Sequence, residues 1–205
     1  MSVPNILATR YASAAMRSIW TPENKIRAER RLWLTVMEAQ ADLGVSLGGD
    51  DPEQVLADYQ AVLDDVDLDS IAEREAITRH DVKARIEEFN ALAGHEHIHK
   101  GMTSRDLTEN IEQMQVLESL RLVRDKMVAT LNQLSRLAAQ FSDQAIAGRS
   151  HNVAAQVTTL GKRFATAIDE MLVAWDHVNE LIERYPARGI KGPMGTAQDM
   201  LDLLG

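Results

Sequence analysis

Apolar residues recur at intervals of three and four along two long stretches in the second half of the chain. The first stretch begins near Arg105 and has apolar residues at Ile111, Met114, Leu117, Leu120, Met127, Leu131, Leu134 and Phe141. This spacing predicts one helix of roughly 37 residues, about 55 Å long. The second stretch runs from Val157 to Tyr185 with a mean apolar spacing close to about 3.5 residues, as in helical bundles. Helices of this length need partners to cover their apolar faces.

The first half of the chain predicts shorter helices, each with a recognisable start. Thr21-Pro22 and Asp51-Pro52 each place a capping side chain directly before a proline, which is favoured in the first helical turn. Two further helices are expected, one at 69–78 and one that begins near Asp81 and stops at Gly94. The stretch that follows, 95–103, is expected to be irregular.

The segment 187–197 is dense in Gly and Pro, which predicts a turn-rich or β-hairpin connector. A further helix is expected to begin at Asp199. We therefore expect an all-α protein in two parts. An N-terminal helical domain covers 1–110, and 111–205 forms the start of a central bundle of long helices.

Composition excludes several function classes. The formal net charge of -9 offers no basic footprint for a nucleic-acid partner. Neither a signal-peptide pattern nor a run of about 18 apolar residues occurs, so we expect no association with a membrane. The chain has no cysteine, which fits a reducing, cytoplasmic location.

The polar segment Thr103-Ser104-Arg105-Asp106 lies where the irregular stretch enters the first long helix. A helix start with hydroxyls and backbone N–H groups attracts carboxylates and phosphates. The same residues also make an ordinary helix cap, with Asp106 favourable in the first turn. The segment alone leaves both interpretations open.

Two further segments carry a histidine close to an arginine. One is 148–152, between the two long helices, where His151 follows Arg149 by two positions; the other is 78–81, with Arg79 and His80. A histidine near an arginine in a turn could exchange a proton beside a bound anion. Either histidine could equally be an exposed turn residue without a role.

His95, His97 and His99 alternate along the irregular stretch, which would place three imidazoles on one side of an extended segment. Such a row could bind zinc. No second cluster of ligands accompanies it, and surface histidines are common, so we expect no metal site.

Taken together and in this order, these segments resemble the adenylosuccinate lyases of the fumarase and aspartase superfamily. The resemblance runs from Arg10 to Gln198. It rests on the motifs Arg10-Tyr11, Thr78-Arg79-His80-Asp81, His99 to Asp106 (HKGMTSRD), Gly148 to Lys162 (with GRSH and QVTTLGK) and Gly189 to Thr196 (GIKGPMGT). Ser150 stands where the family often has threonine, and Lys100 fills a variable position.

The resemblance implies a lyase that needs no cofactor. Members of this family release fumarate by β-elimination from adenylosuccinate, giving AMP, and from the succinylaminoimidazole carboxamide ribotide of purine biosynthesis. This chemistry requires donors around a carboxylate that becomes doubly charged in the carbanion, and an acid for the departing nitrogen. The family forms homotetramers in which long helices from four subunits build a central bundle, and each active site draws on three subunits.

The resemblance also implies roles for individual residues. His151 would be the general acid, with His80 in support, and Thr103 and Ser104 would bind a succinyl carboxylate. The other substrate-binding residues would be Arg10, Tyr11, Arg79, Asp81, Thr158 and Gln198.

The superfamily's mobile loop, Ser-Ser-x-Met-Pro-x-Lys-x-Asn-Pro, carries the general base and does not occur in these 205 residues. We therefore expect the chain to be the N-terminal part of a longer enzyme and to be inactive alone. Two alternatives remain. One is another superfamily lyase, acting on argininosuccinate or a carboxymuconate, and the other is a non-enzymatic helical assembly module.

Overall fold

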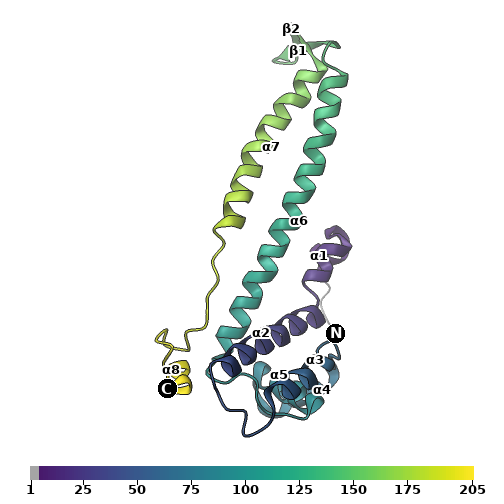
Figure 1. Cartoon of the computed structure of the whole chain (residues 1–205). Helices are drawn as coiled ribbons and strands as arrows, with labels where there is room; N and C mark the ends of the chain where they lie inside the picture. The colour runs from purple at the N-terminus through teal and green to yellow at the C-terminus, as the bar shows by residue number, and fades with distance from the viewer. Residues whose placement is uncertain (1–4) are drawn as a thin grey trace. The chain divides into compact units, whose positions relative to one another are not determined.

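The computed structural model describes residues 5–205, and the chain divides into two compact units. The first unit contains the residues up to Gln115 together with Pro186–Gly205, and the second is Val116–Tyr185. Helices predominate, and the described residues contain a single pair of strands (Figure 1). The expected all-α class is confirmed.

The first unit consists of helices that begin close to the expected residues. Its elements are a π-helical turn Leu7–Tyr11, α1 Ala14–Ile19, α2 Pro22–Asp42, α3 Pro52–Ala61, α4 Leu68–Thr78, α5 Asp81–Ala93, the start of α6 Ser104–Gln140, and α8 Gln198–Leu204. The side chains of Thr21 and Asp51 cap α2 and α3, accepting from the backbone N–H of Asn24 and Glu53 at 3.3 and 3.2 Å. Gly94 ends α5 in the left-handed conformation, with φ at 77°.

Aromatic residues from three helices form the core of the first unit. Trp33 of α2, Tyr59 of α3 and Phe89 of α5 are buried, and the Phe89 ring lies 6.3 Å from the Trp33 ring and 4.9 Å from the Tyr59 ring. Leu107 of α6 packs into the same core, fully buried. The start of α6 is thereby fixed against α2, α3 and α5.

A buried ion pair crosses this core. The Arg30 guanidinium lies 2.6 Å from the Glu88 carboxylate and 4.4 Å from the centre of the Phe89 ring. It also donates to the carbonyl oxygens of Val62 and Leu63 at 2.8 and 2.9 Å. Because the guanidinium bonds both the carboxylate and the loop after α3, the pair ties that loop to α2 and α5.

The second unit is a helical hairpin whose tip is a pair of antiparallel strands. The distal part of α6 leads into β1 Ala145–Ser150 and β2 Val153–Thr159, and α7 Leu160–Glu183 returns from them. The strands differ from our expectation, because Val157 was assigned to the second long helix and lies in β2 instead. His151 and Asn152 join the strands with φ at 49° and 63°, and two consecutive positive φ angles are typical of a tight two-residue hairpin.

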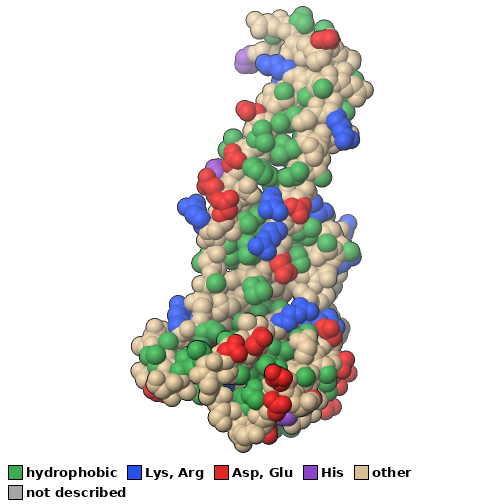
Figure 2. All heavy atoms as spheres, viewed as in Figure 1, with side chains coloured by type: hydrophobic (Ala, Val, Ile, Leu, Met, Phe, Trp, Pro, Cys, Tyr) green, Lys and Arg blue, Asp and Glu red, His purple; other side chains and the backbone are tan. Residues whose placement is uncertain are grey.

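The second unit buries little of its apolar surface. Gly161 is the one buried residue of α7, and Leu172, Val173 and Leu181 remain 44, 56 and 45% exposed. Figure 2 shows hydrophobic side chains interspersed with charged ones along the long helices. None of the helices among residues 5–205 combines the length and the apolar character that a membrane crossing requires.

Substituting Gly161 by Ala should destabilise the second unit. A Cβ there would lie 2.8 Å from the Phe141 carbonyl oxygen and closer still to that of Ala138. Both acceptors are backbone atoms at the end of α6, so the helices would have to separate, at a cost of about 1–3 kcal/mol. Urea unfolding followed by circular dichroism measures the loss.

Ala165→Gly, at an exposed position on the same helix, is the matched control. It should cost about 1 kcal/mol through helix propensity alone. Propensity favours alanine, so a more stable Gly161→Ala chain would show that the close approach of the helices is not a constraint.

Candidate active site

A buried carboxylate organises the start of α6. Asp106 is fully buried, and its carboxylate accepts the backbone N–H groups of Thr103, Lys191 and Gly192 at 3.0, 3.1 and 3.1 Å. The Arg188 guanidinium pairs with the same carboxylate. Burial alone would raise the pKa of Asp106, but these donors outweigh it and hold the pKa below its usual value. A carboxylate therefore caps this helix and also holds the connector 187–197.

Three more polar side chains on the same face of α6 hold the connector. Gln113 accepts the Arg188 backbone N–H at 2.6 Å, and Glu109 lies 2.9 Å from the Arg188 guanidinium. Asn110 exchanges two hydrogen bonds with the backbone of Gly189, at 3.0 and 3.1 Å. The expected turn-rich connector is thus ordered by contacts spread over two turns of helix.

His80 and Ser104 meet at this helix start. His80 caps α5, its Nδ1 accepting the Lys83 backbone N–H at 3.2 Å, and its Nε2 lies 3.3 Å from the Ser104 hydroxyl oxygen. With Nδ1 acting as an acceptor, the neutral ring carries its proton on Nε2 and donates it to Ser104. The Ser104 hydroxyl proton is then available to an acceptor such as a carboxylate.

Arg79 and Asp81, the other two predicted binding residues of the 78–81 motif, differ in their surroundings. Arg79 ends α4 in the left-handed conformation, with φ at 55°, and is exposed. Asp81 lies 3.1 Å from the Arg85 guanidinium, which also pairs with Glu29 at 2.7 Å. The structure thus brings Arg79 and Asp81 to the turn that carries His80, and their predicted roles in binding remain predictions.

His99 belongs to this site and was not among the residues assigned from the sequence. Its Nδ1 accepts the Trp33 indole N–H at 2.9 Å, so its neutral ring carries a proton on Nε2. Burial lowers the pKa of His99, Asp106 acts in the opposite direction, and His80 lowers it further. The sequence placed His99 at the start of the motif His99 to Asp106 but gave it no role, because the contact that orients its ring comes from α2.

The remaining predicted residues belong to other segments of the chain. Arg10 and Tyr11 end the π-helical turn and are exposed, with the guanidinium 5.8 Å from the tyrosine ring centre. Gln198 begins α8 and donates to Asp202 at 2.6 Å. Thr158 and His151 belong to the second unit, on β2 and in the exposed turn of the hairpin.

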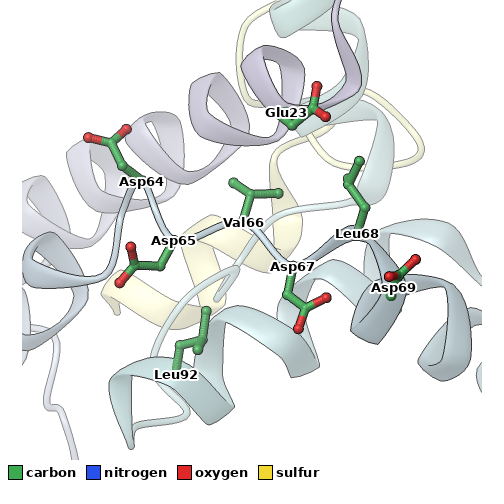
Figure 3. Close-up of a pocket in the computed structure, with 8 residues that line it drawn as sticks. All are labelled: Glu23, Asp64, Asp65, Val66, Asp67, Leu68, Asp69 and Leu92. Carbon is green, nitrogen blue, oxygen red and sulfur yellow. The ribbon is translucent and has the colours of Figure 1, made fainter.

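One cavity on the first unit is lined mainly by acidic residues. It has a volume of about 750 Å³ and is lined by Glu23, Asp64, Asp65, Val66, Asp67, Leu68, Asp69 and Leu92 (Figure 3). Asp64 pairs with Arg27 at 3.3 Å, and Asp67 caps α4. Its concentration of carboxylates would repel an anion, whereas the helix start with Ser104 offers donors.

A helical unit that gathers a hydroxyl, imidazoles and a helix N-terminus at one place offers hydrogen-bond donors to an anion. Residues 9–200 match the sequence profile of the lyase family. The chain belongs to this family.

Curated relatives cover nearly the whole chain. The chain is 33% identical over 203 residues to adenylosuccinate lyase of Saccharomyces cerevisiae and 34% identical over 202 residues to that of Schizosaccharomyces pombe, covering 96% of this chain in both. Adenylosuccinate lyase of Methanothermobacter thermautotrophicus is 30% identical over 91% of the chain. The chain spans only 41–42% of the length of these relatives.

Solved structures agree on the fold. A fumarate lyase from Mesorhizobium sp. BNC1 superimposes with a TM-score of 0.79 at 22% identity, covering 94% of this chain and 46% of the other. A 3-carboxy-cis,cis-muconate lactonizing enzyme from Pseudomonas putida gives 0.76 at 18% identity, covering 97% and 49%. At this level of identity the likeness shows the fold alone.

Replacing Asp106 by Asn should destabilise the first unit by up to roughly 3 kcal/mol, because Arg188 would lose its buried charge partner and keep only Glu109, whose side chain is 40% exposed. The free energy of unfolding should also depend on pH through this carboxylate. The folded-state pKa is depressed, so the stabilisation is complete above the unfolded value of about 3.9 and is lost as the pH falls through the folded value. Urea unfolding at pH 7 and below pH 4 measures both effects.

Asp143→Asn, at an exposed loop position, is the control and should change stability by less than about 0.5 kcal/mol. Limited proteolysis of the Asp106→Asn chain should cut within 187–197. An Asp106→Asn chain as stable and as resistant as the control would mean that the carboxylate does not hold the connector.

Proposed function

We propose that this chain forms part of a cytoplasmic adenylosuccinate lyase, which releases fumarate by β-elimination from adenylosuccinate and from the succinylaminoimidazole carboxamide ribotide of purine biosynthesis. The observation that carries the proposal is the meeting of His80 with Ser104 at the start of α6. The adenylosuccinate lyases among the curated relatives support this choice of substrate.

The helix start would bind the succinyl carboxylate. Ser104, oriented by His80, would donate its hydroxyl proton, and Thr103 would add a second hydroxyl. As charge builds up on the carboxylate in the carbanion, the positive end of the α6 dipole stabilises it. This arrangement would favour the transition state over the bound substrate, which is what the elimination requires.

His151 would protonate the departing nitrogen. Its position in the two-residue turn of the hairpin, exposed and with a positive φ, leaves the imidazole free to approach a bound ligand. Arg10, Tyr11, Arg79, Asp81, Thr158 and Gln198 would contact the rest of the substrate. We assign no general base among these residues, because the family motif that supplies it does not occur in the sequence.

The second candidate is a superfamily lyase with another substrate. The carboxymuconate enzyme among the structural neighbours is consistent with it, and so is an N-acetyl-S-(2-succino)cysteine lyase of Enterococcus italicus, 25% identical over 93% of the chain. The nucleotide part of the substrate distinguishes the candidates, because only adenylosuccinate carries an adenosine monophosphate group.

Adenylosuccinate should bind to the 205-residue chain, and Ser104→Ala should weaken binding about tenfold, since a hydrogen bond to a charged group is worth about 1.5 kcal/mol. Calorimetric titration measures the affinity. Binding is the appropriate readout because we expect these residues alone to release no fumarate. AMP, which lacks the succinyl group, should bind equally to both chains.

Ser142→Ala, an exposed serine of the second unit, is the matched control. Argininosuccinate should not compete with adenylosuccinate. If argininosuccinate binds and AMP does not, the chain belongs to a lyase with the other substrate. If Ser104→Ala binds adenylosuccinate like the control, the carboxylate is not held at the start of α6.

We further propose that the chain assembles through its long helices, as in a homotetramer. The support is the apolar surface that the second unit leaves exposed, on α7 and at Val123 and Val128 of α6, which are 40 and 41% exposed. Burying such residues in a bundle is worth about 1.5–3 kcal/mol for each side chain.

Light scattering at micromolar concentration should therefore show an oligomer, and Leu172→Glu on α7 should shift it towards the monomer. Glu170→Gln, two positions earlier on the same helix and at an exposed position, removes a charge without adding one to the apolar face and should leave the oligomer intact. A stable wild-type monomer would contradict assembly through these helices.

A further inference from the structure

Two loops of the first unit bring a carboxylate and two histidines together. Asp50 lies just before α3, and His95 and His97 follow α5, about 45 positions further along the chain. One potential ligand atom from each residue falls within 4.8 Å of the other two. The centres of the His95 and His97 rings lie 6.0 Å apart, and the angle between the ring planes is 29°. His99 is not part of the group, because its Nδ1 is bonded to Trp33.

We propose that Asp50, His95 and His97 bind one zinc ion. The Asp50 carboxylate oxygen Oδ2 lies 3.0 Å from His97 Nε2 and 4.0 Å from His95 Nδ1. Ligands of a tetrahedral zinc ion, each about 2.0–2.1 Å from the metal, lie about 3.3 Å from one another. The Asp50–His97 pair is already close to this separation, and His95 Nδ1 would have to move towards the other two atoms by about an ångström, which a change in its side-chain torsion angles can supply.

The Asp58 carboxylate orients the His95 ring so that its other nitrogen can bind a metal ion. The carboxylate lies 2.8 Å from His95 Nε2, the ring nitrogen that faces away from Asp50. A proton held between Nε2 and the carboxylate leaves Nδ1 with a free lone pair directed towards Asp50. A carboxylate on the far nitrogen of a histidine ligand is the usual outer contact of zinc sites, and it makes the ligand more basic.

Tyr59 holds the backbone that carries both histidines. Its hydroxyl oxygen lies 2.6 Å from the Asn90 side-chain oxygen, 3.0 Å from the His95 carbonyl oxygen and 3.2 Å from the His97 backbone nitrogen. Tyr59 itself is fully buried in the aromatic core. The spacing of the two rings is thus set by the core of the unit, so that little conformational entropy would be lost on binding.

The surroundings leave room for a water molecule as the fourth ligand. A cavity of about 530 Å³ is lined by Asp50, Arg74, Glu87, Asn90, Ala91, Gly94, His95, Glu96 and His97. The side chains of His95 and His97 are 19 and 15% exposed, and that of Asp50 is 56% exposed. An ion could therefore enter from solvent without opening the core.

The positive charge of Lys100 weakens the binding of a cation at this site. Its ammonium nitrogen lies 3.2 Å from His97 Nδ1, so it adds a positive charge and favours a proton on Nε2, where the metal would bind. The binding of zinc requires this side chain to turn away from the ring. Lys100 therefore provides a test, because removing its charge should strengthen binding.

The experiment uses the 205-residue chain, dialysed against a chelator and titrated with zinc chloride in competition with a chromophoric chelator. We expect one zinc ion per chain, bound at least about tenfold more weakly after Asp50→Asn or His97→Gln. Asp58→Asn should cost about tenfold through loss of the outer contact. Lys100→Met should bind several-fold more tightly. His177→Gln, an exposed histidine of α7, should bind like the wild type.

Thermal unfolding provides a second readout. Zinc should raise the melting temperature of the wild-type and His177→Gln chains but not that of Asp50→Asn, whose exposed position keeps the fold intact. The proposal is overturned if the wild-type chain binds no zinc. It is also overturned if Asp50→Asn and His97→Gln bind zinc as tightly as His177→Gln, since the ions would then lie elsewhere on the surface.

Discussion

The first unit depends on one buried carboxylate. Asp106 joins the first turn of α6 and the end of the irregular stretch at Thr103 to the connector at 187–197, which lies more than 80 positions further along the chain. Its negative charge is fully removed from water and is balanced by the guanidinium of Arg188 and by backbone donors. An unpaired charge at this depth would cost several kcal/mol, so the connector cannot leave without destabilising the helix start.

The hydrogen bonds at the start of α6 decide which protons the site can offer to a ligand. Asp106 accepts the backbone N–H of Thr103 directly before the helix, and the hydroxyl of Ser104, the first helical residue, meets His80. The two imidazoles of the site, His80 and His99, each have Nδ1 occupied by an N–H donor, from the backbone and from Trp33. Both neutral rings therefore have a proton on Nε2, which suits an anionic ligand.

Signals in adjacent residues were sufficient to predict where most helices begin and end. They could not predict structure that depends on contacts between segments distant in the sequence. Thr21-Pro22, Asp51-Pro52 and Gly94 carry their information in adjacent residues, and the helices begin and end there. The hairpin was missed because its apolar residues also fit a helical spacing. Asp106 fitted an ordinary acidic residue of the first helical turn, because its partner Arg188 lies 82 positions away. The polar residues three, four and seven positions after Asp106 lie on the same helix face and are the one local sign of a contact there.

The segment 95–103 is fixed at three points by three different parts of the core. Tyr59 of α3 holds its beginning, Trp33 of α2 holds His99, and Asp106 of α6 holds Thr103. The proposed zinc ligands and the proposed carboxylate site therefore lie at opposite ends of one short, tethered segment. The alternating histidines thus divide by their partners: His95 and His97 are bonded to Asp58 and Asp50, and His99 is bonded to Trp33.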